Sequence, residues 1–521
     1  MVPLSKNTVW ESSRREVVFV GIILLTFIAI NFSVACRTPT VFPDEPEYSD
    51  PAVNLYLGDG FTSTMWAQGR HDFWVGNVPA YQILLAGFFK LFGVGFLQAR
   101  MVNTLLAALA AGMIWLALKR TELIKTAPYR LLSVVLILSG SVSTQTIRTI
   151  RPDTTMFTVC AAVFLAWTVR SEKLRWLAVI LASSLLLPAG IPMLPYGILM
   201  LGLYMIAFGF DSIKTVAATL AGMMLGVGWL CLFYSYFSSI RNFLDNILPF
   251  TVMKAGDASF TQKIIGKFVG DPLDSPDTVF TSFFGKPLEF INPKTLFDYS
   301  SAMLFLIILG LAVFHWATLG KAQKKIVIFA LLMVLVVPPC LHIAGHYRSM
   351  YRWMTYMPLC VLAPCLAESI LKESKAPTVR RIVAGIFFTA IVLGIPARTL
   401  LILPWWSERS VGPLDAAAER VVTKSDVVIG DCKVYFAVRP LAKTVFLLGL
   451  PANGRFDRIK DLPKSEITLL CLKPEELDEM VGIVGGNWQR VASGNPEQEN
   501  ELARTRYNIN FYRRVATGEG N

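Results

Sequence analysis

The 521-residue chain is short of charge, because Asp, Glu, Lys and Arg make up only 17% of it. Soluble proteins carry about 25% charged residues. It also has only 8 cysteines, against 54% hydrophobic residues and a mean hydropathy of +0.51. These values exclude a disordered chain, a small disulfide-stabilised scaffold and an ordinary cytosolic enzyme.

Long apolar runs occupy most of the first 404 residues, and each is a candidate transmembrane helix. We predict eleven spans, near residues 17–36, 100–118, 131–147, 154–169, 176–189, 194–210, 215–238, 300–320, 326–341, 353–367 and 382–403. Gly222 and Gly226 form a small-xxx-small face in one of these spans, which indicates close helix packing.

The distribution of Lys and Arg predicts the orientation, since cytoplasmic loops are enriched in both. With the N-terminus inside, every later basic loop falls inside only if the apolar run 78–96 does not cross the membrane. We therefore expect 78–96 to be a juxtamembrane segment at the outer surface. The inside segments then hold 18 basic and 7 acidic residues, which is +11 of the net charge of +12. The positive charge thus specifies orientation, and we expect no nucleic-acid partner.

The first span also has features of a signal peptide, because basic residues precede its apolar run and the run ends in Ser33-Val34-Ala35. Its length favours an uncleaved anchor. In either case the next segment is outside, where three regions are exposed: 37–99, 239–299 and 405–521. Eleven spans place the C-terminus outside as well.

The composition changes at Pro404-Trp405-Trp406, so we divide the chain into a membrane domain, 1–404, and an outer domain, 405–521. The outer domain is expected to be a small α/β domain with a binding or lid role, because it contains no GxGxxG, P-loop, HExxH or CxxC motif. Cys432 and Cys471 are either disulfide-bonded or simply buried. The predicted helices of the outer domain are 414–424 and 475–484, and its predicted strands are 426–429, 467–472, 488–492 and 507–515.

Two adjacent carboxylates, Asp44 and Glu45, follow the first span in the segment FPDEPEY, residues 42–48. Such a pair can hold a divalent cation, or one member can act as a general base. The alternative is a solvated loop in which Asp44 caps the following helix.

Two groups of cations stand on the outer side, against the inside bias of positive residues. Arg148, Arg151 and Asp153 lie at the end of the third span, where the arginines can bind lipid phosphate or reach the interface as ordinary snorkelling side chains. His346, Arg348 and Arg352 precede the tenth span among aromatic residues; His346 alone also fits an interfacial role.

At these residues the chain resembles the GT-C superfamily of membrane glycosyltransferases. It is most similar to bacterial family-39-like enzymes: relatives of protein O-mannosyltransferases, the lipid A aminoarabinose transferase and the RgtA/B/C/D-like transferases. The similarity covers about residues 15–400. It rests on Asp44-Glu45-Pro46-Glu47-Tyr48 with Gly58-Asp59-Gly60, on Pro79-Ala80-Tyr81 through Ala99-Arg100, on Arg151-Pro152-Asp153, and on Arg352-Trp353 with Pro358.

The chain departs from the family at two points. Asn77-Val78-Pro79 stands where relatives usually carry Lys or His followed by Pro-Pro, and Trp353 replaces a usual Tyr. The first departure removes a basic contact and leaves the donor sugar open.

The resemblance implies a hexosyl- or pentosyltransferase that moves a sugar from a polyprenyl-phosphate donor to an acceptor hydroxyl at the outer face of a bacterial inner membrane. The acceptor is a glycan, a lipid or a protein. We expect Asp44, Glu45 and Asp153 to be catalytic, and Asp44 and Glu45 to bind a divalent metal if one is used. The donor phosphate is expected to contact Arg148, Arg151 and Arg352, with Arg348 and His346.

The alternative function is that of a transporter or lipid flippase. Such proteins often show inverted repeats and polar residues at mid-membrane. Here charges within the spans are scarce, and the polar clusters lie on one face. A membrane-anchored binding protein built on 405–521 leaves eleven spans unexplained. Clustering of Asp44, Arg151 and Arg352 around one outer cavity separates a transferase from these alternatives.

Overall fold

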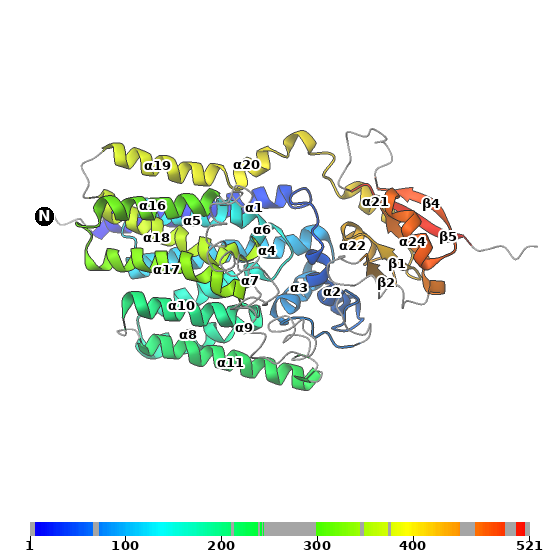
Figure 1. Cartoon of the computed structure of the whole chain (residues 1–521), viewed down its shortest axis with the longest axis horizontal. Helices are drawn as coiled ribbons and strands as arrows, with labels where there is room; N and C mark the ends of the chain where they lie inside the picture. The colour runs from blue at the N-terminus through cyan, green and yellow to red at the C-terminus, as the bar shows by residue number, and fades with distance from the viewer. Residues whose placement is uncertain are drawn as a thin grey trace, which may run out of the picture.

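The computed structural model describes residues 6–65, 72–209, 213–237, 240–241, 243, 299–343, 349–372, 377–448, 464–494 and 507–515. A helical bundle forms one end of the molecule and a small sheet domain the other, with two short helices of the first outer region between them (Figure 1). The predicted outer region 239–299 lies almost entirely outside the described residues.

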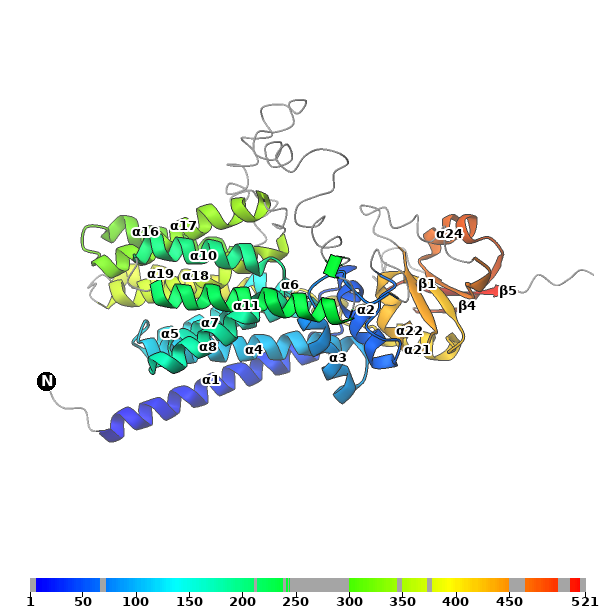
Figure 2. The same cartoon turned by 90° about the horizontal axis from the view of Figure 1, so that it is seen from below.

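The bundle is mostly helical, as the apolar runs predict. Its helices are α1 (Lys6–Val34), α4 (Phe96–Thr121), α5 (Ala127–Ser139), α6 (Ser141–Arg148), α7 (Asp153–Trp167), α8 (Glu172–Ser184), α9 (Leu186–Ala189), α10 (Met193–Phe208), α11 (Ile213–Phe237), α16 (Tyr299–His315), α17 (Lys321–Ile343), α18 (Trp353–Leu371) and α19 (Pro377–Val392). Figure 2 shows the same bundle from below, with α1 along one side.

Each of the eleven predicted spans overlaps a bundle helix, but fewer helices have the full length of a span. Among the described residues five are long and apolar enough, or six if the bent pair α5–α6 counts as one: Arg14–Val34, Phe96–Thr121, Ile213–Phe237, Trp353–Leu371 and Pro377–Trp405. Pro152 and Pro192 immediately precede α7 and α10, which are only 15 and 16 residues long. Each helix begins directly after its proline, at nearly the same residue as the predicted spans 154–169 and 194–210.

Glycines set two close contacts in the bundle. A Cβ on Gly222 or Gly226 would lie 2.5 Å from the carbonyl oxygen of Ile180 or Ser184, so α11 packs directly on the backbone of α8. The predicted packing role of these two glycines is confirmed. Gly140 separates α5 from α6, where the two helices bend by 44°.

The first outer region contains α2 (Asp44–Leu57) and α3 (Ala80–Phe92). With 13 residues, α3 is about 20 Å long, shorter than the ~30 Å apolar core of a bilayer. Its length fits the predicted juxtamembrane segment. A buried cluster that includes Val53, Tyr81 and Phe89 packs both helices on the N-terminal end of α4.

The C-terminal domain is a mixed five-stranded sheet with the order β2-β1-β3-β5-β4. The first three strands are parallel neighbours, and β5 pairs antiparallel with β3 and β4. The strands are β1 (Val427–Gly430), β2 (Thr444–Leu447), β3 (Leu469–Leu472), β4 (Asn487–Ser493) and β5 (Asn510–Val515). The helices around it are α21 (Gly412–Val421), α22 (Tyr435–Val438) and α24 (Leu477–Val484). The α/β expectation is met, with β2 as an additional strand.

The sheet domain docks on α2 through buried polar contacts. Tyr435 donates its hydroxyl proton to Asp50 Oδ1 at 2.5 Å, and Arg439 donates to Asn54 Oδ1 at 2.7 Å from Nη2. One apolar cluster runs from α2 and α3 into this domain. The helix that begins with Asp44 is therefore held from the bundle side and from the domain side.

Candidate functional site

The site begins at the N-terminus of α2, where Asp44 and Glu45 occupy the first helical turn. Carboxylates are stabilised there by the positive end of the helix dipole. Their side chains diverge, because Asp44 reaches Arg151 and Glu45 reaches Arg100. The two adjacent carboxylates are thus parts of two different ion pairs.

Arg151 joins two of the predicted catalytic residues. Its Nη1 contacts Asp44 Oδ2, and its Nε donates to Asp153 Oδ2 at 2.9 Å. The side chains of Arg151 and Asp153 are 5% and 1% exposed, whereas that of Asp44 is 17% exposed. Asp44 is therefore the member of this group that is most open to an incoming molecule.

Aromatic residues and the backbone fix this group. Trp353 Nε1 donates to Asp153 Oδ1 at 3.2 Å, and the Tyr48 ring lies 5.3 Å from the Arg151 guanidinium carbon. Asn103 donates to the Arg151 carbonyl at 3.0 Å. Burial opposes the charge of Arg151, but Asp153, Tyr48 and Asp44 outweigh it, and its pKa is raised above the ordinary value.

Glu45 is fully buried and fully hydrogen-bonded. It accepts from Arg100 Nε and Nη2 at 3.0 and 2.8 Å, and from the backbone N–H groups of Ile150 and Phe42 at 2.9 and 2.8 Å. A carboxylate has about four acceptor positions, and these contacts occupy them. The remaining Nη1 of Arg100 donates to the carbonyls of Ala35 and Pro39, so the pair ties α4 to the first outer region.

The predicted metal ligands do not fit a metal ion in this arrangement. Asp44 is paired with Arg151, and the oxygens of Glu45 are committed to Arg100 and the backbone. In the part of the chain that the structure describes, no three His, Cys, Asp or Glu side chains are grouped as a metal site requires.

The predicted phosphate-binding residues are divided between two places. Arg151 lies between Asp44 and Asp153, whereas Arg148 turns away toward α1 and α20 (Ile395–Leu400). Arg352 ends the 3-10 helix η3 (Ser349–Arg352), which packs on α6 and places the neighbouring Tyr351 near Arg151. His346 and Arg348 lie outside the described residues.

Sequence reasoning missed several members of the site. Arg100 and Tyr48 stood within the matched segments but were given no role there. Asn31 is a lone amide inside the first apolar run, and such a residue is a functional candidate in a membrane helix. Arg398 and Thr399, on α20, carried no distinguishing signal. The thiols of Cys432 and Cys471 are free, so the structure does not form the disulfide considered between them.

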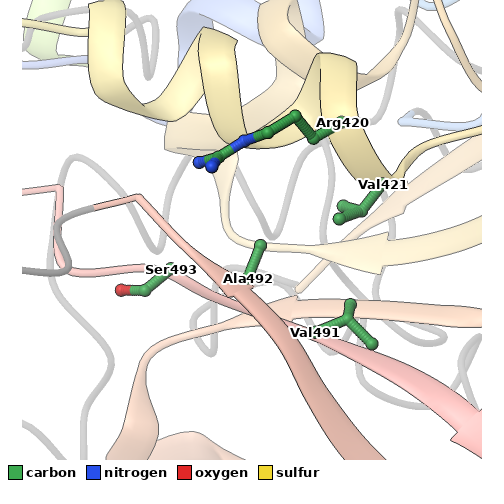
Figure 3. A pocket seen from close by; sticks show the side chains of 5 residues that line it. All are labelled: Arg420, Val421, Val491, Ala492 and Ser493. Atoms are coloured by element: carbon green, nitrogen blue, oxygen red, sulfur yellow. The ribbon is translucent and has the colours of Figure 1, made fainter.

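A cavity of about 260 Å³ lies elsewhere, at the sheet edge of the C-terminal domain (Figure 3). It is lined by Arg420 and Val421 at the end of α21 and by Val491, Ala492 and Ser493 of β4. Arg420 is the one ionisable residue that lines the cavity, and Asp44, Arg151 and Asp153 do not line it.

Comparison with known proteins places the whole chain in one class of fold. No family model matches it, and no curated protein sequence matches it. Among solved structures, the chain is similar in fold to chains that it matches over almost its whole length.

Two of the similar structures are crystal structures of ArnT from Cupriavidus metallidurans. The one bound to undecaprenyl phosphate has a TM-score of 0.59 and 16% sequence identity, over 97% of this chain and 99% of that chain. The apo form has a TM-score of 0.56 and 15% identity, over 99% of this chain and 100% of that chain. The fold is therefore shared from end to end, and the long apolar helices belong to an integral membrane protein.

Proposed function

We propose that this protein is a glycosyltransferase that moves a sugar from a polyprenyl-phosphate donor to an acceptor hydroxyl at the outer face of the membrane. The observation that carries the proposal is the contact between Asp44, Arg151 and Asp153 at one end of the bundle. The ArnT-like fold supports it, since one solved ArnT binds undecaprenyl phosphate.

The reaction is a displacement at the anomeric carbon of the donor sugar. The acceptor oxygen forms a bond to this carbon while the bond from the carbon to the phosphate oxygen breaks. The bonding electrons leave with the polyprenyl phosphate, and the acceptor proton goes to a base. A phosphate needs little protonation to leave, but it does need stabilisation of its charge.

Asp44 is the proposed base, or the group that orients the acceptor hydroxyl. It is the most exposed carboxylate of the site, and Arg151 holds it in a fixed direction. Asp153 balances the charge of Arg151 from the opposite side, and Trp353 fixes Asp153. This arrangement keeps the base aimed before the acceptor arrives.

Glu45 is proposed to position the site rather than to react. Its four contacts leave no oxygen available for a proton or a metal. Because it holds Ile150 N–H and Arg100 together, it sets the distance between α2 and the segment that carries Arg151. We derive no step through a metal ion.

The donor phosphate is proposed to lie at Arg148, which turns toward α1 and α20. Arg352, Arg348 and His346 are kept as proposed contacts of the donor. Arg151 is already balanced by two carboxylates and is better suited to hold Asp44. The acceptor is a glycan, a lipid or a protein. The protein is proposed to lie in a bacterial inner membrane, with its N-terminus in the cytoplasm and the C-terminal domain in the periplasm.

The test is sugar transfer by purified protein in nanodiscs, with a panel of labelled polyprenyl-phosphate sugars and cell-envelope extracts as acceptors. We expect labelled product and released polyprenyl phosphate. General-base catalysis contributes about 10²–10⁴-fold, so Asp44→Asn is expected to reduce transfer at least about a hundredfold.

The matched control is Glu479→Gln, which removes a negative charge from the exposed face of α24. This variant should transfer sugar at the wild-type rate. Wild-type rates from Asp44→Asn would remove the catalytic assignment. Movement of intact lipid across the bilayer without any sugar transfer would favour a flippase.

A further inference from the structure

Five arginines of the described chain are more than nine-tenths buried, and four of them contact a carboxylate. These pairs are Arg100 with Glu45, Arg130 with Glu16, Arg151 with Asp44 and Asp153, and Arg439 with Asp59. Arg148 is the fifth, at 2% exposed, and it has no carboxylate partner among the described residues. Since a buried charge is normally paired, Arg148 is the exception that needs a reason.

The contacts of Arg148 leave part of its guanidinium group unused. Nε donates to Asn31 Oδ1 at 2.6 Å, and Nη2 donates to Thr399 Oγ1 at 3.3 Å. Nη1 is buried and has no hydrogen-bond partner within the described chain. Asn31 donates its own amide to the Phe27 carbonyl at 2.8 Å, so its oxygen is directed at Arg148. Three elements, α1, α6 and α20, therefore converge on one cation.

The other charges around Arg148 are positive. Arg100 and Arg398 both repel it, and no negative group acts on it in the described structure. Arg100 is already balanced by Glu45, and Arg398 lies half-buried on α20, one residue before Thr399. The buried positive charge that no described negative group offsets is that of Arg148.

We propose that Arg148 and Arg398, with Asn31 and Thr399, form a binding site for the phosphate headgroup of a membrane lipid. A phosphate supplies the missing negative charge and accepts from the unused Nη1, and guanidinium groups bind phosphate with charge-assisted hydrogen bonds. This inference deepens the proposed function, on which the identity of the lipid rests. It also separates the phosphate site from the Asp44–Arg151–Asp153 group.

The position of α20 favours a lipid over a soluble phosphate. Leu400, Leu401 and Leu403 are more than half exposed, as is Trp405, and together they form an apolar surface directly after Thr399. Leu400 and Trp405 fall within a segment long and apolar enough to span a membrane. Figure 1 shows α20 between α19 and the C-terminal domain, and α20 packs on α6. A lipid can keep its chain on this surface while its headgroup reaches Arg398 and Arg148.

The segment 148–153 connects this site to the proposed base. Arg148 ends α6, Arg151 follows after two residues, and Asp153 begins α7. A phosphate at Arg148 therefore lies on the same short connection that holds Asp44 through Arg151. The donor is then anchored on one side of this segment and the acceptor hydroxyl is activated on the other.

The test is binding of undecaprenyl phosphate, without a sugar, to the full-length protein in nanodiscs, with undecaprenol as the phosphate-free ligand. Wild type is expected to bind the phosphate at least tenfold more tightly than the alcohol. Arg148→Gln and Arg398→Gln should each lose about tenfold or more, since hydrogen bonds to charged groups contribute about that factor. Arg381→Gln, an exposed arginine at the opposite end of α19, is the matched control and should bind as wild type does.

Phosphatidylglycerol in place of undecaprenyl phosphate separates the lipid sources. If wild type binds phosphatidylglycerol and undecaprenyl phosphate with equal affinity, and Arg148→Gln loses affinity for both lipids, the anion site is supported and its ligand is bulk anionic lipid. Wild-type affinity for undecaprenyl phosphate in both Arg148→Gln and Arg398→Gln overturns the site. Intact binding without sugar transfer overturns the proposed function and leaves the site standing.

A purely structural role is distinguished by thermal unfolding. Removal of an unbalanced buried cation should leave the melting temperature of Arg148→Gln unchanged or higher. Weaker lipid binding with retained stability supports the site. The proposal is contradicted if Arg148→Gln has a lower melting temperature and Arg398→Gln binds the lipid with normal affinity. That pair of results indicates a structural role for Arg148.

Discussion

Arg148 and Arg151 are three residues apart and equally buried, yet they have opposite surroundings. Arg151 lies between two carboxylates, whereas Arg148 has neutral partners and positive neighbours. A buried ion pair is satisfied within the folded chain and can serve to hold a reacting group. An unbalanced buried cation is satisfied only when a ligand brings the opposite charge. The presence or absence of an oppositely charged partner therefore indicates which buried residues hold the site together and which ones bind a ligand.

The largest expected effect contrasts the two arginines in stability. Arg151→Met leaves the buried Asp153 and the partly exposed Asp44 without a cation, and loss of one partner of a buried pair costs about 3–5 kcal/mol. Arg148→Met removes an unbalanced charge, so the free energy of unfolding should stay constant or rise. Thermal or denaturant unfolding of both variants in the same detergent measures the contrast. Equal destabilisation by the two substitutions would contradict it.

Glu45 and Arg100 extend the comparison to a pair with a proposed positioning role. Glu45→Gln leaves Arg100, which is 1% exposed, without its counter-charge, and we expect a loss of about 3 kcal/mol in stability. The double variant Glu45→Gln with Arg100→Met should recover most of that loss. Unfolding of the two single variants and the double variant forms the cycle. A double variant less stable than either single one would show that the pair does not act as a unit.

Trp353→Phe sharpens the role of Asp153 with a smaller expected effect. The substitution removes the 3.2 Å hydrogen bond to Asp153 Oδ1 and keeps an aromatic ring in the buried position. We expect a loss of about tenfold in the rate of sugar transfer, the equivalent of about 1.4 kcal/mol, because Asp153 then holds Arg151 less firmly. Steady-state kinetics should place the loss in kcat. A rise in KM alone would move Trp353 to substrate binding.

Two carboxylates of the C-terminal domain provide the smallest test, through pH. Burial and the nearby Glu419 raise the pKa of Asp415 to about 6. Burial also opposes ionisation of Asp426, but hydrogen bonds from Arg513 and Thr468 outweigh it and lower its pKa. Asp426 therefore stabilises the fold when it is ionised, whereas Asp415 stabilises the fold when it is protonated.

The sign of the pH effect follows from proton binding. Asp415 has an unfolded pKa of about 4, so between about pH 4 and pH 6 the folded state binds more protons than the unfolded state. Its contribution to stability is full below this window, is lost as the pH rises through it, and is constant above it. The difference in melting temperature between wild type and Asp415→Asn should therefore change across pH 4–6. A constant difference would contradict the assignment.

Much of the fold follows from local patterns that a single sequence contains. The long apolar runs predict the bundle helices, and the distribution of Lys and Arg predicts that 78–96 does not cross. Short buried apolar runs predict β1 and β3, and alternation predicts β4 and β5. The bend in one span was not predicted: residues 131–147 were expected to form one helix, but α5 and α6 meet there at 44°. β2 was missed since Thr444–Leu447 has only 4 residues and no polar alternation.

The site was predictable in its residue types but not in its partners. Asp44, Arg151 and Asp153 were expected together, and they are in contact. Glu45, next to Asp44 in sequence, belongs to a different pair because side chains one residue apart on a helix point in different directions. Arg148 contacts Asn31, which is 117 residues away in the sequence, and Thr399, which is 251 residues away. No local sequence pattern specifies contacts over such separations.

The most direct test of the account is the division of kinetic effects between Asp44 and Arg148 in sugar transfer from the active polyprenyl-phosphate donor. We predict that Asp44→Asn lowers kcat at least about a hundredfold with little change in the KM for the donor. Arg148→Gln is predicted to raise that KM about tenfold or more while kcat is largely kept. An equal loss of kcat in both variants with an unchanged KM would contradict the division of roles.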